Sequence, residues 1–290
     1  PPDGNGKFTV GEYSGLLNAP TSPVMFFGGK GGVGKTTIAN ATALKLSAHA
    51  STLVVSTDPA HNVGHLWNMQ VGDTPTTVRP GVDVLELDPA RATNEHLKQA
   101  GDTMRRMMPE HLHKEVSKHL NLAKHSPGTH EAALLERIAI LLEEYGESYD
   151  HIIFDTAPSG HTARLMALPE LMSAWTDGLL ERRAKSEKFS ELVRGMSPTG
   201  KDTTVTTAID PVDRRNQELR SILLKRRHRF ERLRAVLNDA TACTFNIVLT
   251  AERLPVLETD EFHAELTANG VHVGALIVNR RSPADQGEFL

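Results

Sequence analysis

A glycine-rich segment that holds two lysines carries the residues best suited to chemistry in this chain. Residues 29–36 read GKGGVGKT and match the spacing G-x-x-x-x-G-K-[ST] of a phosphate-binding loop. Glycines allow successive backbone N–H groups to turn toward phosphate oxygens, and the positive end of a following helix attracts the same charge. We therefore expect Lys35 to contact the β- and γ-phosphates of a nucleotide and the Thr36 hydroxyl to ligate Mg²⁺.

The other lysine of this loop, Lys30, has no evident structural task, because Lys35 already supplies a cation to the phosphates. Its simplest interpretation is a charge in solvent. The alternative is a cation delivered to a neighbouring active site, as an arginine finger is, and such a group contributes roughly 10³–10⁵ to the rate. We adopt the second interpretation and predict a catalytic role for Lys30.

Polar side chains also follow three of the apolar runs that we expect to be strands. Asp58, Asp155 and Asn279 each come at or just after the end of such a run. In open α/β folds, ligands bind at the carboxyl ends of the strands. We therefore expect Asp155 to be an outer-shell acid for Mg²⁺, the turn at residues 158–160 to sense a γ-phosphate, and Asn279 to contact adenine. Each of these residues taken alone also fits a capping role.

Short apolar runs separated by helical patterns predict the fold. Most of the runs are apolar at every position, as expected for parallel strands that are covered on both faces. Strands that alternate with helices form right-handed βαβ units. We predict an α/β fold with a doubly wound, mainly parallel sheet, a P-loop and an inserted helical subdomain. The expected strands are Val24–Phe27, Thr52–Ser56, Val82–Leu87, Ile152–Thr156, Asn246–Thr250 and Gly274–Val278.

The helical subdomain is expected from two stretches, about 90–145 and 165–240, in which apolar residues recur every three or four positions. Six of the eight methionines lie in these stretches. Flexible thioether side chains suit an adaptable apolar binding surface, and the alternative is an ordinary core. The candidates for such a surface are Met104, Met108, Met172 and Trp175.

The ends of the sequence suggest how the chain is divided. We expect residues 1–22, which are polar and rich in glycine and proline, to be a flexible lead-in. Residues 23–290 are expected to form a single domain, and further chain is expected after Leu290.

Composition excludes several classes of protein. The 290 residues carry a net charge of −4, from 32 basic and 36 acidic side chains, which argues against bulk electrostatic binding to nucleic acid or anionic membrane. No apolar run reaches the 18 residues that a membrane-spanning helix needs. The single cysteine excludes an internal disulfide and suits a reducing cytoplasm.

Several motifs together resemble the ArsA-type ATPases, whose P-loop carries the additional lysine of a deviant Walker A motif. That family includes the bacterial arsenite-pump ATPase and the eukaryotic and archaeal ATPase that targets tail-anchored membrane proteins. The resemblance extends from about Val24 to Asn279. The matching segments are GGKGGVGKTT at 28–37, STDPAHN at 56–62, FDTAPSGHTARL at 154–165 and VNR at 278–280, with ELDP at 86–89, SPGTHEA at 126–132 and AERLPVLET at 251–259 in support.

This resemblance implies an ATPase that uses ATP and Mg²⁺ and works as a nucleotide-gated homodimer, or as a pseudo-dimer with a second half. It implies that Lys30 acts across the subunit interface and that Asp58 positions the attacking water. The expected Mg²⁺ ligands are Thr36, directly, and Asp155, through water. The expected nucleotide contacts are Gly29, Gly31, Gly32, Val33, Gly34, Lys35, Thr36, Thr37, Asn62 and Asn279. The expected switch residues are Asp58, Pro59, Asp155, Pro158, Gly160 and His161.

The client of such a switch stays open. A hydrophobic segment, such as that of a tail-anchored membrane protein, is favoured by the methionine content. A membrane pump subunit for anion or metalloid efflux is the alternative, and either client implies a cytoplasmic protein that visits the membrane surface transiently. A partition-type scaffold ATPase is a third possibility, but it predicts a C-terminal amphipathic or basic element that is not seen in this sequence.

Three features depart from the family pattern or invite other interpretations. The family often uses several cysteines for an intersubunit zinc or a metalloid, whereas Cys243 alone cannot provide convergent soft ligands, so neither is expected here. The five histidines between 111 and 130 lack the spacing of a helical metal site and are interpreted as a solvated face. These histidines are His111, His113, His119, His125 and His130.

The nine basic residues between 214 and 234 are likewise interpreted as a solvated helix face rather than a nucleic-acid site.

Overall fold

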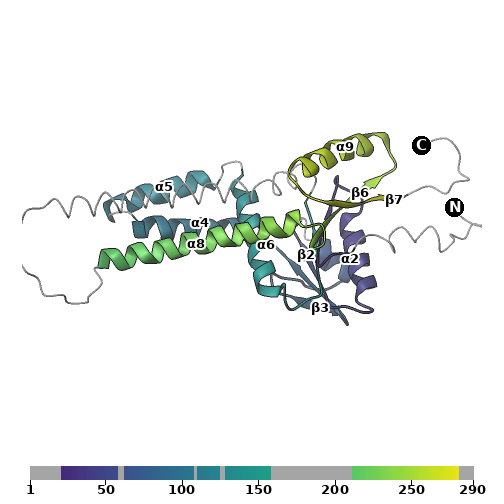
Figure 1. Ribbon diagram of the computed structural model, residues 1–290, viewed down its shortest axis with the longest axis horizontal. Coiled ribbons are helices and arrows are strands. Elements are labelled where there is room, and N and C mark those ends of the chain that lie inside the picture. The colour runs from purple at the N-terminus through teal and green to yellow at the C-terminus, as the bar shows by residue number, and fades with distance from the viewer. Residues whose placement is uncertain (1–20, 58–61, 108–109, 125–127, 158–210, 281–290) are drawn as a thin grey trace, which may run out of the picture.

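The sheet is mainly parallel and doubly wound, as the sequence predicts. The computed structural model describes residues 21–57, 62–107, 110–124, 128–157 and 211–280 (Figure 1). Its strands are β1 (Val24–Gly28), β2 (Thr52–Ser56), β3 (Thr76–Arg79), β4 (Val82–Glu86), β5 (His151–Asp155), β6 (Cys243–Thr250) and β7 (Val273–Asn279). Within the described ranges they form one sheet in the order β3-β4-β2-β5-β1-β6-β7, and every neighbouring pair is parallel except β3 with β4. The predicted doubly wound α/β class is confirmed.

Strand β3 is the element of the sheet that its sequence does not predict. It lies at the edge, antiparallel to β4, and the register shifts between Thr77 and Arg79. Its side chains alternate between half-buried and exposed, so no continuous apolar run marks it. Gly81, with a φ of 76°, forms the turn that leads into β4.

Helices cover both faces of the sheet, and a buried apolar cluster lies beneath each group. On one face, Ala39 and Val63 pack with Phe27. On the other face, the ring of Phe26 stacks on that of Phe154 with centroids 4.7 Å apart. The helices on the first face are α2 (Lys35–Leu46) and α3 (Asn62–Trp67), and those on the second are α6 (Thr129–Tyr145), the end of α8 (Pro211–Asn238) and α9 (Arg253–Ala268).

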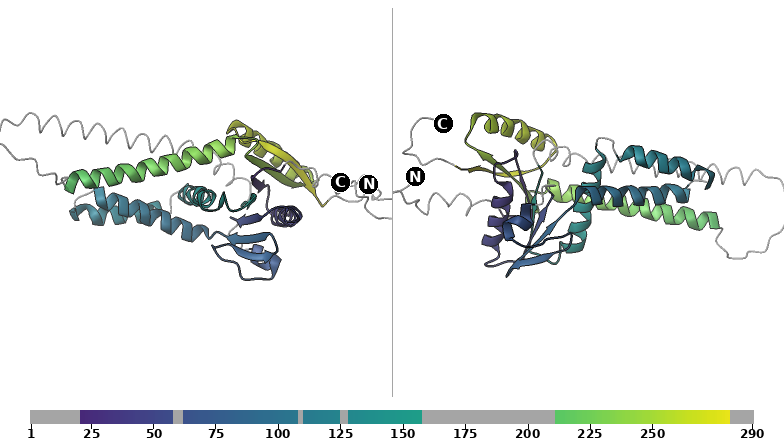
Figure 2. Two further views of the ribbon diagram at one scale, coloured as in Figure 1. Left: turned by 60° about the horizontal axis from the view of Figure 1, so that its bottom comes forward. Right: turned by 180° about the vertical axis from the view of Figure 1, so that it is seen from behind.

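A group of helices projects beyond the sheet. Helices α4, α5 and α8 run beside one another away from the strands (Figures 1 and 2). Helix α4 packs against α5, α6 and α8, and α6 joins the group to the sheet. The part of the predicted helical stretch 165–240 that precedes residue 211 lies outside the described residues, and the expected division at residues 22 and 23 stays a prediction. The new elements are α4 (Pro89–Met107), the short 3₁₀ helix η1 (Glu110–Leu112) and α5 (His113–Ala123).

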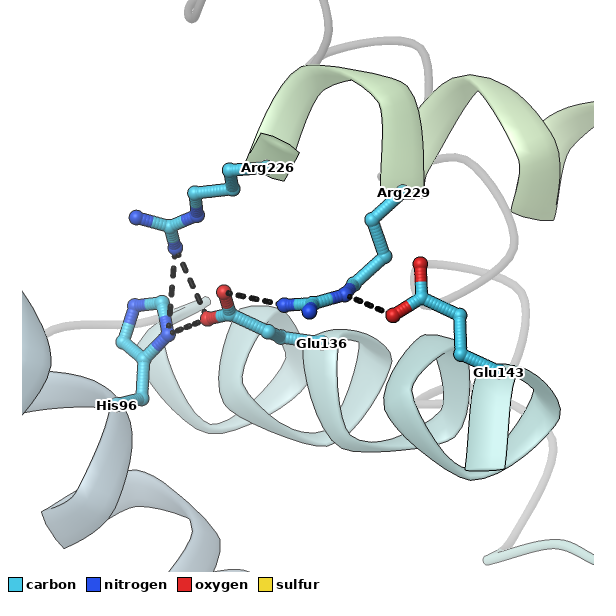
Figure 3. A network of polar contacts seen from close by, with 5 residues as sticks. All are labelled: His96, Glu136, Glu143, Arg226 and Arg229. Atoms are coloured by element: carbon cyan, nitrogen blue, oxygen red, sulfur yellow. Dashed lines mark hydrogen bonds and ion pairs between the residues drawn. The ribbon is translucent and has the colours of Figure 1, made fainter. Parts of the chain in front are cut away.

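A buried network of charged side chains connects three of these helices (Figure 3). Glu136 of α6 is 6% exposed, and its Oε2 accepts hydrogen bonds from His96 Nδ1 of α4 at 2.6 Å and from Arg226 of α8 at 3.1 Å. Arg229, one turn further along α8, lies 3.9 Å from Glu136 Oε1 and donates to Glu143 at 2.9 Å. The interpretation of the basic helix as a uniformly solvated face is therefore wrong for Arg226 and Arg229.

The network sets the charge state of Glu136. Burial raises the pKa of this carboxyl, but the hydrogen bond from His96 and the charges of Arg226, His96 and Arg229 lower it by more, so that the net pKa lies below its ordinary value of 4.5. A carboxylate with a lowered pKa stabilises the folded state above its unfolded pKa, and this contribution is lost as the pH falls through the folded pKa.

We therefore expect Glu136→Gln to lower the free energy of unfolding by about 3 kcal/mol near pH 7, because it leaves the half-buried Arg226 without its counter-charge. The difference from the parent should shrink as the pH falls below 4.5, the ordinary pKa of the group. Urea unfolding at a series of pH values measures both effects.

Glu231→Gln is the matched control for this prediction. It removes a carboxylate that pairs with Arg227 at 2.8 Å on α8, but both side chains are at least 40% exposed. Such surface pairs contribute about 0–1 kcal/mol. Equal destabilisation by the two substitutions would show that the buried network contributes no more to the free energy of unfolding than an exposed ion pair.

Candidate nucleotide site

The strand ends that carry the predicted site residues are neighbours in the sheet. Strand β5 lies between β1 and β2, and Asp155 is in register with Phe27 on one side and Ser56 on the other. Thr57, just past β2, donates to the Asp155 carbonyl oxygen from its N–H at 2.9 Å and from its hydroxyl at 3.2 Å. The loop that follows β1 and the chain that leaves β2 therefore lie on either side of Asp155.

The glycines of the loop are required by its backbone and by close neighbours. Gly29, Gly32 and Gly34 have φ values of 141°, 79° and 94°, a region that residues with a Cβ rarely adopt. A Cβ on Gly29 would overlap the carbonyl oxygen of Val248 on β6, and one on Gly34 would overlap the Asn279 amide. Among the described residues none would meet a Cβ on Gly32, so the requirement shown there is conformational.

The first turn of α2, which directly follows the loop, is suited to bind an anion. Helix α2 begins at Lys35 and has no acidic residue in its first turn, and its N-cap is Gly34, which has no side chain to bond the N–H groups of that turn. Thr36 is half-buried and Thr37 is exposed. A helix N-terminus with this composition attracts phosphate through its N–H groups and its dipole.

The two lysines of the loop point to different partners. The ammonium of Lys35, whose residue is only 6% exposed, donates to the backbone carbonyl of Lys30 at 2.9 Å, across the loop. The ammonium of Lys30 pairs instead with Glu258 on α9, also at 2.9 Å, and both side chains are more than a third exposed. Lys35 is thus part of the loop, whereas Lys30 extends from it toward α9.

Asn279, predicted to contact adenine, is held against the loop. Its Nδ2 donates to the Val33 carbonyl oxygen at 2.8 Å, and its Oδ1 accepts from the backbone N–H of Arg280 at 2.9 Å. The end of β7 therefore supports the loop at Val33. The proposed contact with nucleotide stays a prediction.

The chemistry of the oxygens near the loop fits Mg²⁺. Thr36 offers a hydroxyl in the first turn of α2, and Asp155 offers a fully buried carboxylate at the end of β5. Both are hard oxygen donors of the kind that Mg²⁺ prefers, and Mg²⁺ keeps several waters, which suits an acid that acts through water. These two residues would hold the ion beside the loop.

Several predicted residues fall where the structure gives no description. Asp58, Pro59, Pro158, Gly160 and His161 lie outside the described residues, and for Asn62 only the start of α3 is described, not the side chain. Their roles stay predictions.

Two of the histidines between 111 and 130 contact oxygen atoms of neighbouring residues. Within the described ranges, no group of three or more His, Cys, Asp or Glu residues is arranged to hold a metal ion. His113 contacts the Arg105 carbonyl oxygen and His130 the Thr93 hydroxyl. Among the helices with described residues, none is long and apolar enough to cross a membrane.

Two polar residues near the loop were not predicted. Glu258, the partner of Lys30, lies in a segment noted only for its resemblance to the family. Asn40, in the middle of α2, is 3% exposed and bonds both Thr36 and Trp67. The signal for Asn40 was a polar residue on the same buried helix face as the small side chains of Ala39 and Ala43.

A parallel sheet with this loop between β1 and α2, and with a buried acid at the end of the neighbouring strand, defines a P-loop nucleotide-binding protein. The profile of the family described as "Anion-transporting ATPase" matches residues 22–289. The chain belongs to this family, so the predicted ArsA-type membership and the ATPase class are confirmed.

The relatives carry two kinds of name. "Arsenical pump-driving ATPase" of Acidiphilium multivorum is 35% identical over 73% of this chain and 39% of its own length. "Putative arsenical pump-driving ATPase 2" of Aquifex aeolicus is 31% identical over 92% of this chain and 83% of its own. "ATPase GET3C" of Arabidopsis thaliana is 30% identical over 96% of this chain and 71% of its own. The chain thus spans only about two fifths of the Acidiphilium protein and most of the other two.

Proposed function

We propose that this chain hydrolyses Mg-ATP as a dimer in which each subunit supplies Lys30 to the nucleotide of the other. The observation that carries the proposal is the direction of Lys30: its ammonium pairs with Glu258 on α9, while that of Lys35 is bonded into its own loop. A half-exposed cation that extends from the loop is available to a second copy of the chain. Such a cation stabilises the charge that develops on the transferred phosphoryl group.

Each residue of the site then has its own task. The backbone N–H groups of the loop and Lys35 would hold the β- and γ-phosphates, and Thr36 and Asp155 would hold Mg²⁺, directly and through water. Bound Mg²⁺ would neutralise charge on the phosphate oxygens. Asp58 orients the attacking water. Because Lys30 comes from the partner, turnover requires the dimer to close, which couples hydrolysis to assembly.

Concentration dependence tests this proposal. If both subunits build each site, the ATPase rate per subunit should rise with protein concentration as dimers form, in step with the dimer fraction from sedimentation. A rate per subunit that stays constant while the chain passes from monomer to dimer would contradict the proposal.

Exposed apolar side chains on helices α4, α5 and α8 favour a hydrophobic client. Met104, Leu122 and Leu224 are 37%, 62% and 42% exposed on α4, α5 and α8. These helices project from the sheet, and α6 connects them to it (Figure 2). We infer that this group binds an apolar segment, such as that of a tail-anchored membrane protein, and changes shape with the nucleotide. Met108, Met172 and Trp175 lie outside the described residues, and their part in this surface stays a prediction.

A pump-driving role is the second candidate, because relatives along most of this chain are named for it. The cysteine content argues against direct metalloid control within this sequence. Cys243 begins β6, is 1% exposed and packs in the core, and burial raises the pKa of its thiol to about 12. A neutral, buried thiol is a poor ligand for a soft metalloid.

We therefore expect arsenite and antimonite to leave the ATPase rate of this chain unchanged, because a single buried thiol cannot provide three convergent soft ligands. Steady-state rates with and without the metalloid measure this, and Cys243→Ala is the control for any thiol effect. A stimulation that disappears in Cys243→Ala would contradict the prediction and favour the pump.

A further inference from the structure

A buried amide links the loop helix to the helix that follows β2. Asn40 lies in the middle of α2 with 3% of its surface exposed. Its Nδ2 donates to the Thr36 carbonyl oxygen at 2.8 Å, and its Oδ1 accepts from the indole Nε1 of Trp67 at 2.7 Å. Trp67 is the last residue of α3. One side chain therefore bonds the backbone of the proposed Mg²⁺ ligand and the end of α3 at the same time.

Helix α3 is fixed at a second point. The backbone N–H of Gly64 donates to Oε1 of Glu86, a buried carboxylate at the end of β4, at 2.9 Å. Val63 of the same helix is fully buried. Upstream, Thr57 is bonded twice to the Asp155 carbonyl. The chain thus leaves β2 at a point fixed to β5 and enters a helix fixed to α2 and β4.

Asn40 is an unusual choice for its position. An asparagine in a helix interior is less favourable than alanine or leucine, and a buried amide is costly unless it is hydrogen-bonded. An apolar side chain would fill the same place beside Ala39 and Ala43 without that requirement. The amide holds α3 at one distance and one angle from Thr36, which an apolar contact does not enforce.

We propose that Asn40 is a positioning residue for the ATPase reaction. It acts through Thr36 and Trp67: the amide holds the end of α3 and the first turn of α2 in a fixed place relative to each other. The inference rests on the proposed function, since the reaction that it serves is ATP hydrolysis. A small misplacement of reacting groups lowers a rate by up to about 100-fold, so loss of this link should lower turnover.

Two single substitutions break the link from its two ends. Asn40→Leu removes the amide, and Trp67→Phe keeps an aromatic ring but removes the indole N–H. We expect each to lower kcat for Mg-ATP about tenfold while the KM changes less than twofold, because the loop and Lys35 still hold the phosphates. Both should also lose stability, since Trp67→Phe leaves the buried oxygen of Asn40 without its donor and Asn40→Leu leaves the indole N–H of the half-buried Trp67 without its acceptor.

The double variant Asn40→Leu/Trp67→Phe separates positioning from stability. Removing both polar partners leaves no unsatisfied group, so the unfolding midpoint should return toward that of the parent. If Asn40 positions α3, kcat should stay low in this variant although stability is restored. If kcat returns with stability, Asn40 is only a structural residue and the proposal is overturned.

Tyr149→Phe is the matched control. It removes a hydrogen bond of 2.6 Å to Asp83 that lies at the opposite end of the strands, and it should lower stability without changing kcat. The parent is assayed first. If it hydrolyses Mg-ATP and the double variant recovers kcat, only the role of Asn40 is overturned; if the parent does not hydrolyse Mg-ATP, the proposed function falls, and this inference with it.

Discussion

Replacing Lys35 with alanine should weaken Mg-ATP binding by 10²–10³-fold or more, on the order of 3–4 kcal/mol for two charge-assisted contacts to phosphate. Lys35 is buried in the loop and already bonds a carbonyl oxygen there, so its ammonium is fixed close to where phosphates would lie. No other described side chain of the loop supplies a cation from within it, because Lys30 extends to α9. Isothermal titration calorimetry measures the dissociation constant directly.

Lys45→Ala is the control for this result. Lys45 lies in the last turn of the same helix, about three turns from the loop, and its loss should leave the dissociation constant unchanged. Thermal unfolding of both variants shows whether the fold is kept. A Lys35→Ala protein that is folded and binds Mg-ATP as tightly as the parent would remove the P-loop assignment.

Replacing Lys30 with alanine should have the opposite profile. We expect Mg-ATP binding within a few-fold of the parent and a loss of turnover of 10³-fold or more, which is the contribution of an arginine-finger type of cation. The physical reason is that a cation which enters a closed site stabilises charge only as it develops in the transition state, so that it affects kcat and not ground-state binding.

The ion pair between Lys30 and Glu258 offers a control within the same contact. If Lys30→Ala acted only by breaking this pair, Glu258→Gln would reproduce the loss, because it removes the other partner. The pair is more than a third exposed on both sides and is therefore worth little to stability. We expect Glu258→Gln to keep the turnover of the parent. An equal loss in both variants would assign a local structural role to Lys30.

The parts of this fold that could be predicted are those with a local signal. The central strands are buried along almost their whole length because helices cover both faces, and the apolar runs around Phe26 and Phe154 follow from that burial. The loop could be predicted because its glycines serve backbone conformations that other residues avoid. Strand β3 could not, since only its pairing with β4 makes it a strand.

The parts that escaped prediction depend on contacts between distant segments. Glu136 and Arg226 lie 90 positions apart, and nothing in the basic pattern of α8 shows which arginines turn inward. Lys30 and Glu258 meet only because α9 lies near the loop. Asn40 looked like an ordinary helix residue, and its partner Trp67 became apparent only once α3 was placed.

The site residues also divide into those with a local sequence signal and those that depend on contacts between distant segments. Lys35 and Thr36 were assigned from the motif, and the structure places them at the start of α2. The contact of Asn279 with adenine stays a prediction, whereas the support that its amide gives the loop at Val33 is a contact that spacing along the chain could not reveal. A motif specifies which residues meet a ligand more readily than it specifies which residues hold the motif in place.

The central claim, that each active site draws Lys30 from the other subunit, is tested most directly by mixing two inactive variants. Lys30→Ala lacks the donated cation and Asp58→Asn lacks the residue that orients water. In a mixed dimer, one of the two sites combines the intact Asp58 of the first chain with the intact Lys30 of the second. Random pairing makes about half of the dimers mixed, each with one complete site of two, so about one quarter of the parental rate should return. If tagged subunits show that mixed dimers form and the rate stays at the level of the separate variants, Lys30 acts within its own subunit and the account is contradicted.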